Sequence, residues 1–339
     1  VENRKEKKSS DAQSKVRGQT VTADAGPKLG ADTKDMIRQP PPKSLKPTFK
    51  DRASVLQDGG DRVKISSNRL TGSIALTGAR IDDLVLKGYR SSLDPNSEEI
   101  ILLQPQGSEK PYYAEFGWLG SAVEVPNARS VWKSDRSVLS PGKPITLSWD
   151  NGKGLLFERV ISLDNSYMFQ ITQRVKNLTP QVISLAPYGL VSRTGTPEVL
   201  GFYILHEGMI GVLKGVLQEV DYDEFDDGRP KRFESKGGWL GITDKYWLAA
   251  LIPNQQQTAN TSFVSHKRGS QHAYQADYLS PSMSVNPGEM IEAKTNFFAG
   301  AKEKKLLDSY MADLKVDKFD LAVDFDWFWF FTKPFFSAL

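Results

Sequence analysis

Alternating apolar and polar residues dominate the chain over residues 63–299. The clearest example covers residues 167–176, where Phe169 and Ile171 are separated by polar side chains. Successive side chains of a strand point to opposite faces, so this period of two predicts a strand with one buried and one wet face. Residues 177–180, which read Asn-Leu-Thr-Pro, are typical of the turn that ends such a strand.

A hairpin and several further strands extend this pattern. Residues 150–154, which read Asp-Asn-Gly-Lys-Gly, separate two apolar runs and are typical of a tight turn between antiparallel strands. Other short runs with strand character cover residues 112–118, 182–186, 239–243, 246–252, 262–265 and 291–299. No long helical period interrupts them, so the predicted fold class is mainly β, with one large β-sandwich over residues 63–299.

A helical period begins only after residue 300. Five apolar residues recur at the spacing that places them on one face of a helix: Leu306, Leu307, Tyr310, Met311 and Leu314. We expect this face to pack on the sandwich and to fix its orientation. Residues 316–325 alternate again and predict a last extended piece, so residues 300–325 are expected to be a helical linker with an extended end.

The chain closes on an aromatic run that follows Asp326. It contains seven aromatic residues and one lysine: Trp327, Phe328, Trp329, Phe330, Phe331, Lys333, Phe335 and Phe336. These aromatics surround a helix instead of forming one stripe, which fits a soluble core poorly. Trp favours the membrane–water interface, and a lysine can extend its ammonium to lipid phosphates. Residues 326–339 are therefore predicted to begin an amphipathic helix at the membrane interface.

Composition separates residues 1–62 from the rest of the chain. They hold one aromatic residue, Phe49, three successive prolines at 40–42, and 14 Lys/Arg against 9 Asp/Glu. So little apolar surface cannot offset conformational entropy, which predicts a disordered linker.

The net charge of the whole chain is only +3 over 339 residues, which does not indicate a nucleic-acid partner. A first residue other than Met and an apolar last segment lead us to expect a fragment cut at both ends.

No residue pattern predicts a catalytic or metal site. The chain has no cysteine, which excludes thiolate catalysis and disulfides. The three histidines, His206, His266 and His272, fit no ligand motif and are expected on the surface or in loops. The acidic group at residues 221–227 lacks the spacing of a calcium loop, and the paired glycines 237–238 lack a phosphate-binding loop. We expect no catalytic residue, no metal and no cofactor.

Two motifs resemble the first periplasmic domain of the YidC/Oxa/Alb family of membrane protein insertases, in its YidC branch. The first motif consists of Ser235, Gly237, Gly238 and Trp239, followed by Ile252 and Pro253. The second is Val-Asp-Phe at residues 323–325 with the aromatic run after it, and it looks like the junction into that family's interfacial helix. Asp326 stands where the family usually has glycine. Residues 151–169 are similar to alphaproteobacterial members, and the resemblance covers residues 63–339.

The resemblance implies a fold, a location and a set of partners. The fold is a galactose-mutarotase-like β-supersandwich, followed by the helical linker and the interfacial helix, on the periplasmic face of the bacterial inner membrane. The domain is implied to be non-catalytic, a scaffold and docking surface for accessory subunits of the Sec translocon, with SecD/SecF and SecYEG as partners. The protein's own membrane core, inner-membrane lipid and nascent membrane proteins are the other implied partners.

The implied fold also leaves a second hypothesis, a carbohydrate- or peptide-binding β-sandwich with a mutarotase-like cleft. A cleft lined by Trp with nearby carboxylates would favour a sugar. Apolar edges with an exposed strand would favour a polypeptide. A third hypothesis, a soluble lectin-like protein unrelated to membranes, does not explain the aromatic end of the chain.

Overall fold

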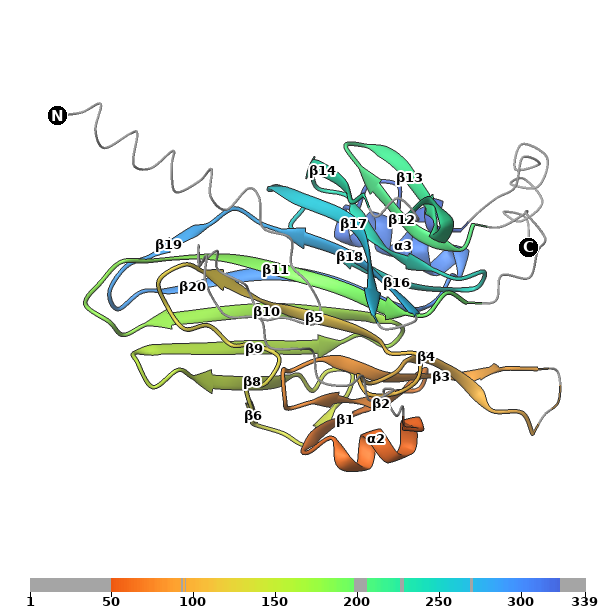
Figure 1. Ribbon diagram of the computed structural model, residues 1–339, viewed down its shortest axis with the longest axis horizontal. Coiled ribbons are helices and arrows are strands. Elements are labelled where there is room, and N and C mark those ends of the chain that lie inside the picture. Colours follow the sequence, from red (N-terminus) through yellow and green to blue (C-terminus); the bar gives the residue numbers. More distant parts are fainter. Residues whose placement is uncertain are drawn as a thin grey trace, which may run out of the picture.

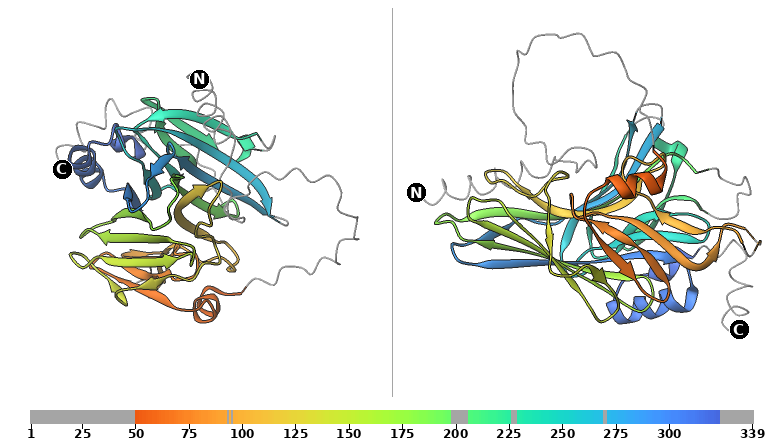
Figure 2. Two further views of the ribbon diagram at one scale, coloured as in Figure 1. Left: turned by 90° about the vertical axis from the view of Figure 1, so that its left-hand side faces the viewer. Right: turned by 90° about the horizontal axis from the view of Figure 1, so that it is seen from below.

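The computed structural model describes residues 50–323, except 93, 95, 198–205, 226–228 and 269–270. Two large β-sheets pack face to face, and short helices lie at their periphery (Figure 1). The turned views of Figure 2 show the two layers and the separate positions of the helices. The prediction of a mainly β fold with one large sandwich is confirmed.

The first sheet contains eleven strands, of which nine form one continuous order. These nine are β14 (Lys231–Lys236), β17 (Thr258–Arg268), β18 (Gln271–Leu279), β11 (Ile183–Thr194), β5 (Tyr112–Gly120), β3 (Ile81–Arg90), β2 (Leu70–Ala75), β1 (Arg62–Ser66) and β7 (Val138–Leu139). Two further strands branch from this order: β4 (Glu99–Leu103) pairs with β3, and β19 (Met283–Val285) pairs with β11. The pairing is antiparallel except between β1 and β7.

The second sheet contains nine strands, all antiparallel to their neighbours. In order they are β13 (Val216–Asp221), β12 (Gly208–Leu213), β15 (Trp239–Thr243), β16 (Trp247–Ile252), β20 (Met290–Ala301), β10 (Met168–Asn177), β9 (Leu155–Leu163), β8 (Ile145–Asp150) and β6 (Lys133–Ser134). The predicted hairpin joins β8 to β9, and the predicted strand at residues 167–176 is β10.

Side chains from the two inner faces fill the space between the sheets. Phe116 on β5 meets Phe297 on β20 edge to face at 6.0 Å, and Phe297 meets Phe169 on β10 at 5.9 Å. Arg159 on β9 crosses between the sheets, and its guanidinium donates to the carbonyl oxygen of Ala79 at 2.6 Å. Complete burial lowers the pKa of Arg159 to about 10, because water no longer solvates its charge.

The expectation of a disordered linker over residues 1–62 is wrong for its last part. Residues 52–58 form helix α2 (Arg52–Asp58), capped by Asp51, and β1 begins at Arg62. Arg52 and Arg62 form ion pairs with Asp83 and Asp82, two buried carboxylates on β3. This polar segment is held by charge pairing with a distant strand, which its own low hydrophobicity does not reveal.

The expected extended piece over residues 316–325 is also wrong where the structure describes it. Helix α3 (Lys304–Leu314) is followed by a 3-10 helix, η2 (Phe319–Ala322), and β20 continues to Ala301. Phe319 and Ala322, three residues apart, are both buried. A spacing of three matches the 3-10 period, so the burial follows a short helix instead of a strand.

The predicted interfacial residues 326–339 and residues 1–49 lie outside the described part of the chain. Among the described residues, none of the helices is long and apolar enough to span a bilayer.

Candidate functional site

The apolar face of α3 lies against the sandwich. Leu307 and Tyr310 are buried, and the other three members of the predicted face, Leu306, Met311 and Leu314, are partly buried against the same core. Opposite them, Lys305 is exposed. The 3.6-residue period therefore corresponds to the side of the helix that the sheets cover.

Aromatic rings join α3 and η2 to the second sheet. Phe298 on β20 meets Tyr310 edge to face at 6.0 Å and Phe319 at 5.7 Å. Trp239 on β15 meets Phe319 at 5.3 Å, and its indole N–H donates to the carbonyl oxygen of Lys318 at 3.3 Å. These edge-to-face contacts fix the helix and the following turn relative to the sheet.

The motif residues Ser235, Gly237, Gly238 and Trp239 form the tight connection that brings Trp239 to this position. Gly238 has φ +85°, and a Cβ there would lie 2.0 Å from the carbonyl oxygen of Val212. Only glycine fits such a position. The Ser235 hydroxyl accepts from the backbone N–H of Lys214 at 2.8 Å and donates to the carbonyl oxygen of Gly237 at 3.2 Å.

The two halves of the first motif meet through Gln255. Its side chain accepts from the N–H of Gly238 and donates to the carbonyl oxygen of Gly238, both at 2.9 Å. The same amide donates to the carbonyl oxygen of Pro253 at 2.7 Å. Ile252, which precedes Pro253, is buried at the end of β16. Gln255 was not among the predicted residues, although it stands only two residues after Pro253, the last residue of the motif.

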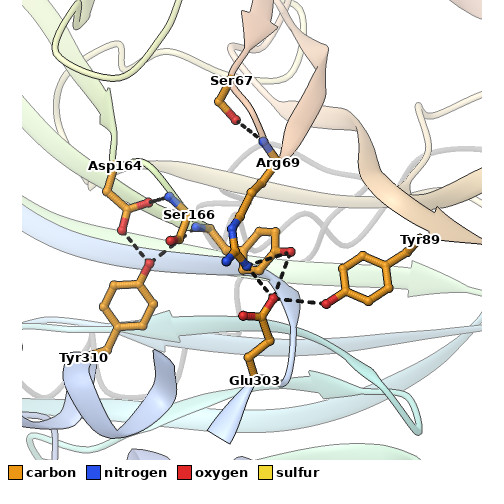
Figure 3. Close-up of polar contacts among 8 residues, drawn as sticks. Ser67, Arg69, Tyr89, Asp164, Ser166, Glu303 and Tyr310 are labelled. Atoms are coloured by element: carbon orange, nitrogen blue, oxygen red, sulfur yellow. Dashed lines mark hydrogen bonds and ion pairs between the residues drawn. The ribbon is translucent and has the colours of Figure 1, made fainter. Parts of the chain in front are cut away.

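A polar cluster, which we call the Glu303 junction, holds the start of α3 (Figure 3). It consists of Glu303, the residue that precedes α3, with Arg69, Tyr89 and Tyr167. Glu303 forms an ion pair with Arg69 and accepts hydrogen bonds from the hydroxyls of Tyr89 at 3.0 Å and Tyr167 at 3.3 Å. Ser67 accepts from the N–H of Arg69 at 3.2 Å and so shapes the turn that carries it.

The electrostatics of the Glu303 junction favour the charged ion pair. A hydrogen bond with the Tyr167 hydroxyl, and then the Glu303 carboxylate, raise the pKa of Arg69. Burial, with the nearby Tyr167 and the Glu303 carboxylate, raises the pKa of Tyr89, so this phenol stays protonated and donates. The side chains of Arg69 and Glu303 are 39% and 33% exposed, so solvent screens part of the attraction.

A second polar contact holds the middle of α3. The hydroxyl of Tyr310 donates to Asp164, in the loop between β9 and β10, and accepts from the backbone N–H of Tyr167 at 3.4 Å. The other oxygen of Asp164 accepts from the N–H group of Ser166 at 2.8 Å (Figure 3). The same oxygen accepts from the N–H group of Met168 at 3.0 Å. One side chain thus shapes the loop and anchors the helix.

Sequence patterns could not reveal these polar partners. Glu303 and Arg69 are 234 residues apart, and Tyr310 and Asp164 are 146 apart. The only local signal is the position of Glu303, directly before the periodic helix. Gly300 adds a steric condition, since a Cβ there would lie 2.2 Å from the ring of Tyr167.

The residues weighed for chemistry do not converge on one site. His206 contacts Asp221 at 3.1 Å and the carbonyl oxygen of Met209 at 2.9 Å. His272 contacts the Ser265 hydroxyl at 3.2 Å on the neighbouring strand. Among the described residues, no group of three His, Asp or Glu side chains is placed to hold a metal ion. Residues 226 and 227 of the acidic group lie outside the described residues.

The arrangement defines a class of domain: a β-sandwich with the helix α3, which follows its strands, fixed to the sheets. Among solved structures, the chain is similar to the galactose mutarotase related enzyme from Lactobacillus acidophilus, with a TM-score of 0.50. The match covers 70% of this chain and 97% of that one at 12% identity. At this identity the likeness shows the fold alone, and it confirms the galactose-mutarotase-like sandwich.

Sequence comparison gives the particular family. The sequence model of the YidC periplasmic domain family matches residues 62–338. The membrane protein insertase YidC of Methylobacterium sp. (strain 4-46) is 48% identical over 290 residues, which cover 82% of this chain and 46% of that protein. The corresponding protein of Granulibacter bethesdensis is 45% identical over 289 residues, or 83% and 50%. The chain belongs to the YidC periplasmic domain family and spans about half the length of the curated relatives it matches.

Proposed function

We propose that this domain is a non-catalytic scaffold of a membrane protein insertase, on the periplasmic face of the inner membrane. Its role is to hold the segment that leads toward the membrane core in one orientation. The observation that carries the proposal is the attachment of α3 and η2 to the sandwich at three places: the Glu303 junction, the Tyr310–Asp164 contact and the edge-to-face contact between Trp239 and Phe319.

Three attachments restrict the helix more than one could. A single contact leaves rotation about it, whereas contacts at the start, middle and end of the α3–η2 segment oppose both rotation and lifting. The buried Leu307 adds roughly 1.5–3 kcal/mol of apolar burial beneath the polar contacts. A stiff connection transmits the position of the sandwich to whatever follows residue 323.

The finer parts of the proposal concern residues and partners beyond these contacts. The aromatic residues of 326–339 lie at the membrane interface, with Lys333 near the lipid phosphates. The outer surface of the sandwich docks accessory subunits of the Sec translocon, with SecD/SecF and SecYEG as partners. Nascent membrane proteins and the protein's own membrane core are the other proposed partners. The segment before α2 serves as a linker.

Distance measurements test the scaffold role. Because the chain has no cysteine, spin labels placed by Lys153→Cys and Asp313→Cys report the position of α3 relative to the sheets. We expect one narrow distance distribution in the parent and a broad one after Glu303→Ala combined with Tyr310→Ala. The exposed Lys305→Ala on the same helix is the matched control and should leave the distribution narrow.

The same substitutions in the full-length insertase connect orientation to function. Insertion of a client membrane protein into proteoliposomes, and co-purification of Sec subunits, should fall when the distribution broadens. The scaffold proposal is wrong if α3 becomes mobile while insertion and co-purification stay at parental levels.

Vesicle binding tests the interfacial assignment separately. Co-sedimentation with anionic liposomes should fall when Trp327 and Trp329 are changed to Ser, or when the chain ends at Val323. The matched control is Tyr246→Ser, an aromatic residue that is 57% exposed elsewhere on the domain. Equal pelleting of all these variants would contradict a membrane role for the aromatic run.

A further inference from the structure

We propose that a cleft beside β4 binds an extended polypeptide segment, which pairs with the outer edge of β4 as an added strand. The segment carries apolar side chains and a Lys or Arg. This inference goes beyond the scaffold role and does not depend on it. It is carried by the path of the first sheet around β4, by the shape of the cleft and by its charges.

Among the described residues, no strand occupies the position next to β4 on the side away from β3. One edge of β3 pairs with β2 from Ile81 to Leu86, and the other edge pairs first with β5, at Ile81 and Ala114, and then with β4, from Leu84 onward. The strands β5 and β4 therefore follow one another along the same edge. Beyond β5 comes β11, which ends at Thr194 and does not continue beside β4.

The outer edge of β4 thus has no strand partner among the described residues. A bridge between Gln104 and Tyr112 closes the end nearest β5. Strand edges carry unpaired backbone N–H and C=O groups, which another extended chain can satisfy. Addition of a peptide strand to such an edge is a common mode of recognition.

A cleft of about 540 Å³ lies along this edge. Five consecutive residues line it, residues 98–102. Because successive side chains of a strand point to opposite faces, a cleft that touches five in a row runs along the edge and not over one face. At a rise of roughly 3.3 Å per residue, five residues offer about 17 Å of edge, enough for a short strand.

The remaining walls come from both sheets. The end of β11 contributes Arg193 and Thr194, and the second sheet contributes Asp244 and Trp247. Arg193 is already paired with Asp244 at 2.5 Å, with its guanidinium 5.0 Å from the ring centre of Tyr112. This pair neutralises its own charge, so it forms a fixed wall instead of a free anion site.

The free charges in the cleft are of both signs: the carboxylates of Glu98 and Glu99 lie along β4, and the ammonium of Lys110, whose side chain lies beside Gly195, also lines the cleft. Glu98 and Glu99 line the cleft, and among the described residues no basic side chain forms an ion pair with either. The carboxylate of Glu99 accepts one backbone hydrogen bond, from Gly88 at 3.3 Å. Ile100, Ile101 and Leu102 follow, so a cation on the ligand lies beside the carboxylates and its apolar side chains lie beside the aliphatic ones.

The same features favour a polypeptide over a sugar. A sugar site needs several converging polar side chains and an open aromatic face. Here Arg193 and Asp244 are paired with each other, and the Trp247 ring packs edge to face with Tyr89 at 5.0 Å and with Tyr246 at 6.1 Å. A strand edge with three aliphatic neighbours offers main-chain hydrogen bonds and apolar contacts.

Peptide binding to the unaltered full chain provides the test. The probe is a fluorescein-labelled octapeptide of alternating Val and Thr with a Lys at each end, followed by fluorescence anisotropy. Two analogues carry N-methyl groups on alternate amides, one on the even positions and one on the odd. A strand added to one edge uses only alternate amides, so one analogue should bind at least tenfold more weakly and the other like the parent peptide.

Charge variants and a saccharide complete the test. Glu98→Lys combined with Glu99→Lys should weaken binding of the Lys-containing probe at least tenfold, whereas Glu124→Lys, an exposed change elsewhere, should not. Equal binding of both N-methyl analogues, or no effect of the two Glu changes, overturns the proposal. Competition by maltohexaose but not by unlabelled peptide also overturns it and assigns the cleft to a carbohydrate.

Discussion

Replacing Leu307 by Ala isolates the apolar contribution of α3 to the stability of the whole domain. Leu307 is completely buried between the helix and the sandwich, and its neighbours belong to the same hydrophobic core. Alanine keeps the helix, because it is the best helix former, and removes only the side chain that packs on the sheets.

The expected loss is large because the site is fully enclosed. Buried Leu→Ala changes cost about 2–5 kcal/mol, the sum of lost transfer free energy and the cavity left behind. For a domain of this size each kcal/mol lowers the melting temperature by roughly 2–4 °C, so a loss of about 3 kcal/mol predicts a decrease of about 6–12 °C. The exposed Lys305→Ala, on the same helix, should stay within about 0.5 kcal/mol of the parent.

Scanning calorimetry and urea unfolding measure both quantities. If α3 docks as part of one cooperative unit, Leu307→Ala should shift a single transition and leave the urea slope unchanged. A melting temperature within about 1 °C of the parent would refute the reasoning, since at 2–4 °C per kcal/mol the docked helix would then contribute almost nothing. Local release of α3 before the main transition would show that the helix opens as a separate unit.

Three further predictions concern single polar or conformational features. Tyr310→Phe should cost about 1–2 kcal/mol in urea unfolding, because it leaves Asp164 without its hydroxyl donor, and an unchanged midpoint would contradict the importance of this contact. Gly238→Ala should lower the free energy of unfolding by more than about 2 kcal/mol, since it combines a left-handed φ with a backbone clash, whereas Gly152→Ala, with φ +66° and open space, should cost only about 1 kcal/mol. Burial raises the pKa of Asp277 to about 6, above its unfolded value of 3.8, so its contribution to stability is complete below pH 4 and is lost as pH rises through 6. Asp277→Asn should therefore gain about 3 kcal/mol relative to the parent between pH 4 and pH 7.5, and a pH-independent difference in unfolding free energy would refute this assignment.

The strands were predictable because their signal is local. In β9 the burial alternates at every residue, and in β10 the buried Phe169, Ile171 and Val175 follow from the same period. A strand with one wet face must alternate whatever its partner is. The apolar face of α3 was readable for the corresponding reason, the 3.6-residue period.

The errors occur where a distant partner decides the local structure. Residues 50–62 are polar and were expected to be disordered, but Asp82 and Asp83 on β3 bind the arginines of this segment. Over residues 316–323 the apolar spacing fits both a strand and a 3-10 turn. The structure has the 3-10 turn, in which the Phe319 ring contacts the rings of Trp239 and Phe298.

By itself the sequence determined the mainly β class, the large sandwich, the helix after it and the family, because local periods and short motifs carry that information. Only the tertiary structure decided which strands are neighbours, and hence that Glu303 meets Arg69 and that one edge of β4 has no strand partner within the described part of the chain. The physical reason is that backbone pairing and charge neutralisation join residues far apart in the chain, and their free energy exists only once the sheets have assembled.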